Sequence, residues 1–388
     1  MNNDDLEYDY YEDIPSPATM EKKKRRRRRI LIQVVSWALI VVLAIVVIGV
    51  GVAIYMVNHG GKSLQQKTEG SAPTFEMQPT AAPDGGELQV QATEPPVPIE
   101  WQSDWIQYGD TIYDYNENIM TFLFLGIDKE GEVELTDKKA DGGQSDAMFL
   151  VVVNPDKEQI DLIGINRDTM VDVYCYGYEQ YGDVMVVEAQ LTTQFGFGDG
   201  GAQSAKYTKE AVSTLFYNLP ITGYVSIGYD AIPKINDAIG GVDVVCLEDM
   251  TAKKKTWFEG ANLHLEGNDA MIYVRWRNCS LFESARVRLA RQKQYLNAFI
   301  SKVVSETKKD ITVPVNLYKK VTEYMTTDIT ADQVVYLTSQ LLDYSFGEIY
   351  TLEGETVKGE RFEEFYPDYG KLKELMLQVF YEPVELNQ

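Results

Sequence analysis

Histidine and cysteine are the scarcest chemically versatile residues in this chain. Among 388 residues there are two histidines, His59 and His264, and three cysteines, Cys175, Cys246 and Cys279. This disfavours Ser-His-Asp or Cys-His catalysis and a histidine-ligated transition metal. The cysteines are too few and too scattered for a disulfide scaffold or a zinc site, and their odd number leaves at least one thiol unpaired. We interpret the cysteines as buried or incidental, and His264, near an expected helix start, as structural.

Common nucleotide-binding loops are absent as well. The sequence contains neither Gly-x-x-x-x-Gly-Lys-Ser/Thr nor Gly-x-Gly-x-x-Gly, so the usual phosphate cradles are missing. The glycine-rich stretch FGFGDGG at residues 195–201 is expected to be a flexible loop.

One long run of the sequence has no charge at all. Residues 30–57 comprise 28 uncharged, mostly apolar positions, and eight consecutive lysines and arginines at residues 22–29 precede them. A helix needs about 20 apolar residues to cross a bilayer, and basic residues stay on the cytoplasmic side. The pattern predicts a single-pass, type II cell-membrane protein: a disordered cytoplasmic tail at 1–29, a transmembrane helix at 30–57, and an extracellular remainder. A cleaved signal peptide is the alternative, but the apolar run is too long and no small-residue cleavage site closes it.

The part after the membrane run is acidic. It carries 52 acidic against 28 basic side chains, which is not the surface of a nucleic-acid-binding protein. Residues 58–110 are rich in Gly, Pro, Ser, Thr and Gln and are predicted to be an extracellular linker. Short apolar runs then alternate with helical patterns, which favours helices layered on a mixed sheet. We expect a catalytic domain at 111–308 and a helical C-terminal extension of the same domain at 309–388.

Three apolar runs place charged residues at their ends. TFLFLGI ends at Asp128, AMFLVVV follows Asp146, and IDLIGIN ends at Arg167. If the second and third runs pair as a hairpin across NPDKEQ, Asp146 and Arg167 meet at one sheet edge. The first run can deliver Asp128 to the same edge.

A basic cluster follows later in the chain. Its members are Arg275, Arg277, Arg286, Arg288, Arg291 and Lys293, with Glu283 as the one acid. The first two alternate like a strand, whereas Arg288, Arg291, Gln292 and Tyr295 share one helix face. Arginine forks suit phosphate oxygens, and carboxylates suit a hard cation, so the combination favours phosphoryl transfer with Mg²⁺ or Mn²⁺. A solvated basic helix face and pairing of the arginines with surface acids are the alternatives.

Several motifs, in order behind the expected anchor, resemble the LytR-CpsA-Psr family of bacterial cell-envelope proteins. They are FLFLGID, GQSDAMFLVVVNPDKEQIDLIGINRDTMVDV, IPKINDAIGGVDV, HLEGNDAMIYVRWR and RLARQKQYL. The resemblance covers about residues 118–305. It implies a three-layer α/β/α sandwich with a mixed central sheet and an apolar groove for a polyprenyl chain. It also implies Mg²⁺-assisted transfer of a glycopolymer from undecaprenyl pyrophosphate to peptidoglycan, forming a phosphodiester; the polymer is a teichoic acid, a capsule or another wall glycan.

The resemblance also implies roles for single residues. Asp128 and Asp146 correspond to the metal-binding carboxylates, and Arg167 to the principal pyrophosphate-contacting arginine. The remaining catalytic and substrate-binding positions are Arg275, Arg277, Arg288, Arg291 and Gln292. Helix packing or an ion pair is the alternative role for Arg291.

Two positions depart from the family pattern. Gln144 stands where many members have Arg, and Ala285 stands where many have Asp. Glu283 could replace the missing Asp, and Asp168 is expected to shape a turn, with action as a base as its alternative. The general base stays open. Two other functions also stay open: a non-catalytic protein that binds polyprenyl phosphate or wall polymer, and a lipid pyrophosphatase.

Overall fold

The computed structural model describes residues 53, 55–68, 72–75, 102, 105–138, 140–176, 184–278 and 281–384. Residues 57–388 form one compact unit. Both the cytoplasmic tail and nearly all of the transmembrane run at 30–57 lie outside the described residues. Within those residues, no helix is both long enough and apolar enough to cross a bilayer.

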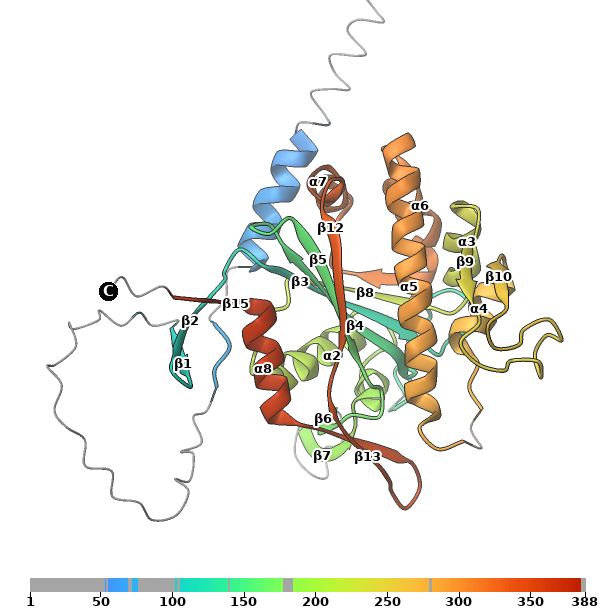
Figure 1. Ribbon diagram of the computed structural model, residues 1–388, viewed down its shortest axis with the longest axis horizontal. Helices are drawn as coiled ribbons and strands as arrows, with labels where there is room; N and C mark the ends of the chain where they lie inside the picture. Colours follow the sequence, from blue (N-terminus) through green and yellow to red (C-terminus); the bar gives the residue numbers. More distant parts are fainter. Residues whose placement is uncertain are drawn as a thin grey trace, which may run out of the picture. The chain divides into compact units, whose positions relative to one another are not determined.

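A six-stranded mixed sheet forms the centre of the unit, as expected (Figure 1). Its strands, from one edge to the other, are β11 (Met325–Thr327), β8 (Gly223–Gly228), β3 (Met120–Ile127), β4 (Ser145–Asn154), β5 (Gln159–Ile165) and β12 (Ser345–Thr351). The expected hairpin is confirmed, because β4 and β5 pair antiparallel from Met148↔Ile165 to Asn154↔Gln159.

The strand directions bring several chain segments to one edge of the sheet. Strand β8 runs parallel to β3, and β12 runs parallel to β5. Since β4 is antiparallel to both β3 and β5, strands β3, β5, β8 and β12 all end where β4 begins. Ligands of α/β sheets commonly bind beyond the carboxyl ends of parallel strands. We call this edge the carboxyl edge.

Side chains of the sheet alternate between two packed faces. Leu123, Leu125 and Ile127 of β3 pack in a buried cluster that includes residues of α2 and α8. Met120 and Phe122 of the same strand belong to a second cluster that includes residues of α7. This alternation buries both faces of the strand, which is why TFLFLGI is almost continuously apolar. The helices are α2 (Ala202–Leu215), α3 (Ala231–Ala238), α4 (Asn268–Arg275), α5 (Ser284–Lys309), α6 (Val313–Val321), α7 (Ala331–Leu341) and α8 (Tyr369–Phe380), with 3₁₀ turns η1 (Leu191–Phe197) and η2 (Thr322–Tyr324).

The C-terminal part is not purely helical, which corrects the expectation for residues 309–388. Strands β11 and β12 belong to the central sheet. SFGEIYT, the sequence of β12, alternates weakly because it is an edge strand with only partly buried side chains. The other strands form small sheets: β1 (Ile106–Tyr108), β2 (Thr111–Tyr115) and β15 (Tyr381–Pro383); β9 (Val242–Val245) and β10 (Asn262–Leu265); β6 (Met170–Tyr176) and β7 (Val184–Gln190); β13 (Gly354–Lys358) and β14 (Glu363–Pro367).

The first part of the predicted linker is also structured. Residues 55–68 are helical, and Leu64 is fully buried in the cluster with Met120 and Phe122. Gly60 lets this helix approach α7 closely, because a Cβ there would lie 2.4 Å from the carbonyl oxygen of Asp332. The glycines that suggested flexibility therefore serve close helix packing.

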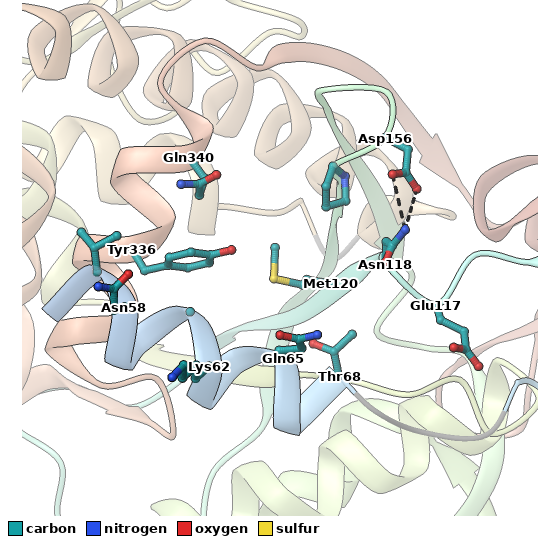
Figure 2. A pocket seen from close by; sticks show the side chains of 13 residues that line it. Asn58, Lys62, Gln65, Thr68, Glu117, Asn118, Met120, Asp156, Tyr336 and Gln340 are labelled. Atoms are coloured by element: carbon teal, nitrogen blue, oxygen red, sulfur yellow. Dashed lines mark hydrogen bonds between the residues drawn. The ribbon is translucent and has the colours of Figure 1, made fainter. Parts of the chain in front are cut away.

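Between this helix and the start of β3 lies a polar cavity of about 940 Å³, shown in Figure 2. Tyr336 and Met120 face into it, and Asn118 donates to Asp156 at its rim. The cavity lies at the opposite end of β3 from Asp128. Eight residues of strand separate the two ends, or roughly 26 Å at 3.3 Å per residue.

Candidate functional site

Asp146 is the centre of a charged cluster at the carboxyl edge. Its carboxylate pairs with the guanidinium of Arg167, as the hairpin argument predicted. The guanidinium of Arg288, at the start of α5, donates to Asp146 Oδ2 at 2.9 Å and to its backbone oxygen at 3.2 Å. The hydroxyl of Tyr229 donates to the same Oδ2 at 2.7 Å. Because the side chain of Arg288 is only 4% exposed, this ion pair is largely shielded from water.

Asp128 lies at the same edge but is exposed. It follows the last residue of β3, and its Oδ1 accepts a hydrogen bond from the backbone N–H of Gln144 at 2.6 Å. The backbone N–H of Asp128 donates back to the Gln144 carbonyl at 3.0 Å. These two hydrogen bonds place Asp128 beside Gln144, which directly precedes β4 and lies two residues before Asp146.

Three side chains hold Arg167 in place: Asp146, Gln144 and Asp168. Its Nη2 donates to Gln144 Oε1 at 2.8 Å, and its Nε donates to Asp168 at 3.2 Å. Burial lowers the pKa of Arg167, Asp168 partly offsets that effect, and the charges of Arg288 and Arg277 lower the pKa further. Like charges gathered this closely are stabilised by an anion.

Asp168 serves the turn after β5. Its backbone N–H donates to the Asn166 side chain, and its carboxylate accepts from Arg167 and from Gln190. The side chain is 4% exposed, and burial raises the pKa of Asp168 even though Arg167 opposes the shift. Asp168 therefore positions Arg167 rather than facing a ligand.

Arg275 and Arg277 lie at the end of a helix, not on a strand as their alternation suggested. Arg275 is the last residue of α4, and its guanidinium lies 4.5 Å from the ring centroid of Tyr229. It also pairs with the exposed Glu130 at 3.2 Å. Arg277 is close enough for its charge to lower the pKa of Arg167. Tyr273 and Val274 are adjacent in sequence and both are buried. This fits a helix and not the alternating burial of a strand.

Arg291 and Gln292 do not face this cluster, which corrects their assignment to substrate binding. Arg291 is completely buried; its guanidinium donates to the carbonyls of Tyr273 and Trp276, and its Nε pairs with Glu248 at 2.7 Å. Gln292 donates to the Val274 carbonyl at 3.1 Å. Both side chains satisfy carbonyl groups at the C-terminal end of α4 and so hold Arg275 in place.

Tyr229 is the site residue that the sequence reasoning missed. Its signal was present: β8 pairs with β3 in parallel register up to Ile127↔Gly228, so the next residue of each strand lies at the carboxyl edge. Those next residues are Tyr229 and Asp128. Burial raises the pKa of Tyr229, which keeps its hydroxyl protonated as a donor to Asp146.

Other candidates have structural surroundings. His264 Nδ1 lies 2.8 Å from Asp243 across the β9–β10 pair, on the surface. Cys175 and Cys246 are buried and free, and Cys279 lies outside the described residues. The expected flexible loop at 195–201 is instead a packed turn, because a Cβ on Gly198 would lie 2.4 Å from the Ser204 backbone. Glu283 pairs with Arg286 at 3.4 Å and has no such contact with Asp146.

An almost purely apolar cavity of about 310 Å³ lies under α5, α6 and α7. Ile160 of β5 and Val225 of β8 contribute from the sheet, and Ile300 and Val304 from α5. Arg288 is on the same helix, twelve residues before Ile300, which corresponds to about 18 Å along the helix axis. Ala211, Val212 and Leu215 of α2 do not line this cavity, because they lie in the buried core cluster on β3.

The carboxylates are compatible with a hard cation. Mg²⁺ in proteins is commonly held by one or two carboxylates, with water and substrate oxygens completing the octahedron. Asp128 and Asp146 meet that need, although in the described part of the chain no group of three His, Cys, Asp or Glu side chains could hold a metal by itself. Any cation here therefore depends on oxygens of the substrate.

Fold and site together define an α/β protein in which arginines from three chain segments converge at the carboxyl edge of a mixed sheet. A model of the LytR_cpsA_psr family matches residues 94–375. This chain belongs to the LytR-CpsA-Psr family.

Similar proteins agree with that assignment. A polyisoprenyl-teichoic acid–peptidoglycan teichoic acid transferase, TagV of Bacillus subtilis, is 26% identical over 200 residues, which are 50% of this chain and 46% of TagV. TagU of Bacillus cereus, with the same activity in its name, is 27% identical over 219 residues, 55% of this chain and 62% of TagU. The match thus spans less than two thirds of either relative. A solved structure of TagT bound to LI-WTA covers 68% of this chain and 89% of its own, with a TM-score of 0.51 and 20% identity, which is a likeness of fold.

Proposed function

We propose that this protein is a membrane-anchored, extracellular phosphotransferase. It moves a glycopolymer of the teichoic acid class from a polyisoprenyl pyrophosphate carrier to peptidoglycan. Residues 30–57 anchor it in type II topology, and the domain that follows is an α/β/α sandwich. The observation that carries the proposal is the convergence of Arg167, Arg288 and Arg275 on Asp146 and Tyr229 at the carboxyl edge.

The arginines supply the binding energy for a pyrophosphate. The exposure of their side chains rises from one to the next: Arg288 is 4% exposed, Arg167 12% and Arg275 40%. The deeper guanidinium groups act in a medium of lower dielectric constant than water, where a charge-assisted bond to a phosphate oxygen is stronger. Arg275 is open enough to contact the exposed end of the ligand. This gradient suits a pyrophosphate with one end buried and a polymer leading out into solvent.

The transfer itself is an in-line displacement at phosphorus. A hydroxyl oxygen of peptidoglycan forms the new P–O bond at the sugar-linked phosphorus, and the P–O bond to the polyprenyl phosphate breaks. The hydroxyl proton passes to a carboxylate or to water. Arginine side chains neutralise the charge that spreads over the phosphoryl oxygens and the leaving phosphate. Asp128 and Asp146 would hold Mg²⁺, which when bound neutralises further phosphate charge.

The apolar cavity under α5, of about 310 Å³, accommodates one segment of the carrier's hydrocarbon chain. Since α5 begins at the charged cluster and also lines that cavity, a single ligand can touch Arg288 with its pyrophosphate and Ile300 and Val304 with its chain. Burying this apolar surface stabilises the complex by roughly 25 cal/mol per Å². This feature favours a lipid-linked donor over a soluble nucleotide-linked one.

The test uses the full-length chain in lipid nanodiscs with a labelled lipid-linked polymer and peptidoglycan. Arg275→Ala should lower transfer by about 10²–10³-fold without loss of folding, because its side chain is part-exposed. Lys302→Ala, which removes an exposed charge elsewhere, is the control. Equal transfer by wild type and Arg275→Ala would refute the assignment.

Two alternative functions have distinct outcomes in the same assay. Release of the polymer phosphate without acceptor would indicate a lipid pyrophosphatase. Bound lipid in mass spectra of the purified chain, with no turnover of either kind, would indicate a binding protein.

A further inference from the structure

A third cavity lies at the carboxyl edge, next to the charged cluster, and we call it the carboxyl-edge cavity. Its volume is about 390 Å³, which is within the roughly 300–1,000 Å³ typical of ligand sites. Gly164 and Asn166 at the end of β5 line one side, and Thr351 and Glu353 at the end of β12 line the other. Strands β5 and β12 are hydrogen-bonded neighbours, so this cavity is displaced from Arg167 by about one strand spacing, ~4.8 Å.

Helix α5 presents a second basic face to this cavity. Arg286 and Lys293 line it, and they are seven residues apart, so they lie on one side of the helix. The buried Arg288 projects toward Asp146 instead. The pyrophosphate site leaves Arg286 and Lys293 of the original basic cluster without a role.

Of the two basic residues, Lys293 gives the stronger indication that a ligand binds in the cavity. It is half-buried, and in the part of the chain that the structure describes it forms no hydrogen bond or ion pair. Burial lowers the pKa of Lys293, with Glu348 opposing the shift at longer range. An anion in the cavity would remove that cost. Arg286 is 73% exposed, and its single ion pair, with Glu283, is long at 3.4 Å.

The rest of the cavity suits a ligand with mixed polar groups. Glu283, which pairs with Arg286, and Glu353 add two acids to the lining, and Thr351 and Thr356 add hydroxyls. Such a lining matches a molecule that carries both carboxylates and N–H donors. The backbone N–H of Glu283 donates to Glu363 Oε1. An exposed aromatic side chain directly precedes each of these two residues in the sequence, namely Phe282 and Phe362.

Asn166 connects the two sites. Asn166 lines the cavity, and the next residue, Arg167, contacts Asp146. The cavity therefore adjoins the loop that carries Arg167.

We infer that the cavity between α5 and the ends of β5 and β12 binds the acceptor, an amidosugar with an attached acidic peptide. This inference rests on the proposed function. Arg286 and Lys293 bind its carboxylates, and Glu283 and Glu353 accept hydrogen bonds from its acetamido and amino groups. The site thereby selects a muropeptide-type acceptor over a neutral glycan.

The experiment measures binding of a soluble disaccharide-peptide fragment of peptidoglycan to the full-length chain in nanodiscs, followed by transfer. The double variant Arg286→Ala/Lys293→Ala should raise both the Kd and the acceptor KM about tenfold or more. The Kd for the lipid-linked donor should not change. The control Lys302→Ala/Lys309→Ala removes two charges with the same seven-residue spacing from the same helix, where both pair with Glu306, and should change neither constant.

A chemical counterpart makes the test independent of folding. Amidating the fragment's carboxylates should weaken its binding to wild type but not to the double variant. Lys293→Gln, which keeps most of the side-chain volume, should show an intermediate loss. Equal affinity of wild type and the double variant for the acidic fragment would overturn the inference. Charge-dependent binding without any transfer would instead reject the proposed function and leave the acceptor-type site standing.

Discussion

Replacing Asp146 by Asn tests whether the charged cluster is held together by one carboxylate. In wild type this side chain is 11% exposed and faces Arg167 and Arg288, which are 12% and 4% exposed. Asparagine keeps the shape but removes the negative charge, so two nearly buried guanidinium groups lose the carboxylate that they share, while Arg167 keeps its pair with Asp168. Removing one partner of a buried ion pair costs about 3–5 kcal/mol.

Asp128→Asn is the matched control, because the chemical change is identical. Asp128 is exposed, and its one hydrogen bond, from the Gln144 N–H, can be accepted equally by an asparagine oxygen. We expect it to lower the free energy of unfolding by about 1 kcal/mol or less. The two variants should therefore differ in stability, while both lose transfer activity if both carboxylates serve the same cation.

The assay is thermal unfolding of the purified chain with and without inorganic pyrophosphate. For a unit of this size, a loss of 3–5 kcal/mol corresponds to a fall in Tm of roughly 6–10 °C for Asp146→Asn. Pyrophosphate at 100 times its Kd should recover about 2.7 kcal/mol, since it replaces the missing charge. Equal melting temperatures of the Asp146 and Asp128 variants, or no recovery with pyrophosphate, would refute the reasoning.

Three further perturbations separate structural from functional residues. Arg291→Met should lower the free energy of unfolding by about 3–5 kcal/mol, measured by denaturant titration, whereas Arg275→Ala should cost about 1 kcal/mol or less and reduce mainly turnover. Gly60→Leu should lower the Tm, because even a Cβ would lie 2.4 Å from the carbonyl of Asp332; an unchanged Tm would show that the helix is not docked on α7. The pKa of Asp168 is raised in the folded state, so the unfolded chain loses this proton first and stability falls as pH rises from about 4 through the folded pKa; Asp168→Asn should remove that component from a plot of unfolding free energy against pH.

The position that departs from the family pattern now has a physical account. The family resemblance of the sequence motifs implied Arg at the position of Gln144. Here its amide oxygen accepts from Arg167, and its backbone exchanges two hydrogen bonds with Asp128. A neutral acceptor can orient Arg167 without adding another positive charge to the cluster. The charges of Arg288 and Arg277 already lower the pKa of Arg167.

The missing Asp at position 285 has no equivalent replacement at Glu283. Ala285 is buried, whereas Glu283 immediately precedes α5 in a left-handed conformation and lines the carboxyl-edge cavity with Arg286. A shift of two residues along a helix start rotates a side chain onto another face. Glu283 therefore belongs with the acceptor side of the site.

Sequence alone determined the pairing that creates the site. The apolar runs before Asp128, after Asp146 and before Arg167 are short and separated by turn residues, so their order and the hairpin could be predicted. Strand pairing then fixes which ends meet, since each strand has two faces and two ends. That is why the meeting of Asp146 and Arg167 was predictable from local pattern.

Only the tertiary structure decided which arginines of the basic cluster reach that site. Helical periodicity gives the angle between Arg288, Arg291 and Lys293, but not which face of α5 meets the sheet. Packing turned Arg288 toward Asp146, buried Arg291 against the end of α4, and left Lys293 at the carboxyl-edge cavity. The parallel pairing of β8 with β3 likewise brought Tyr229 to Asp146, because a contact between residues 83 positions apart depends on which surfaces bury one another.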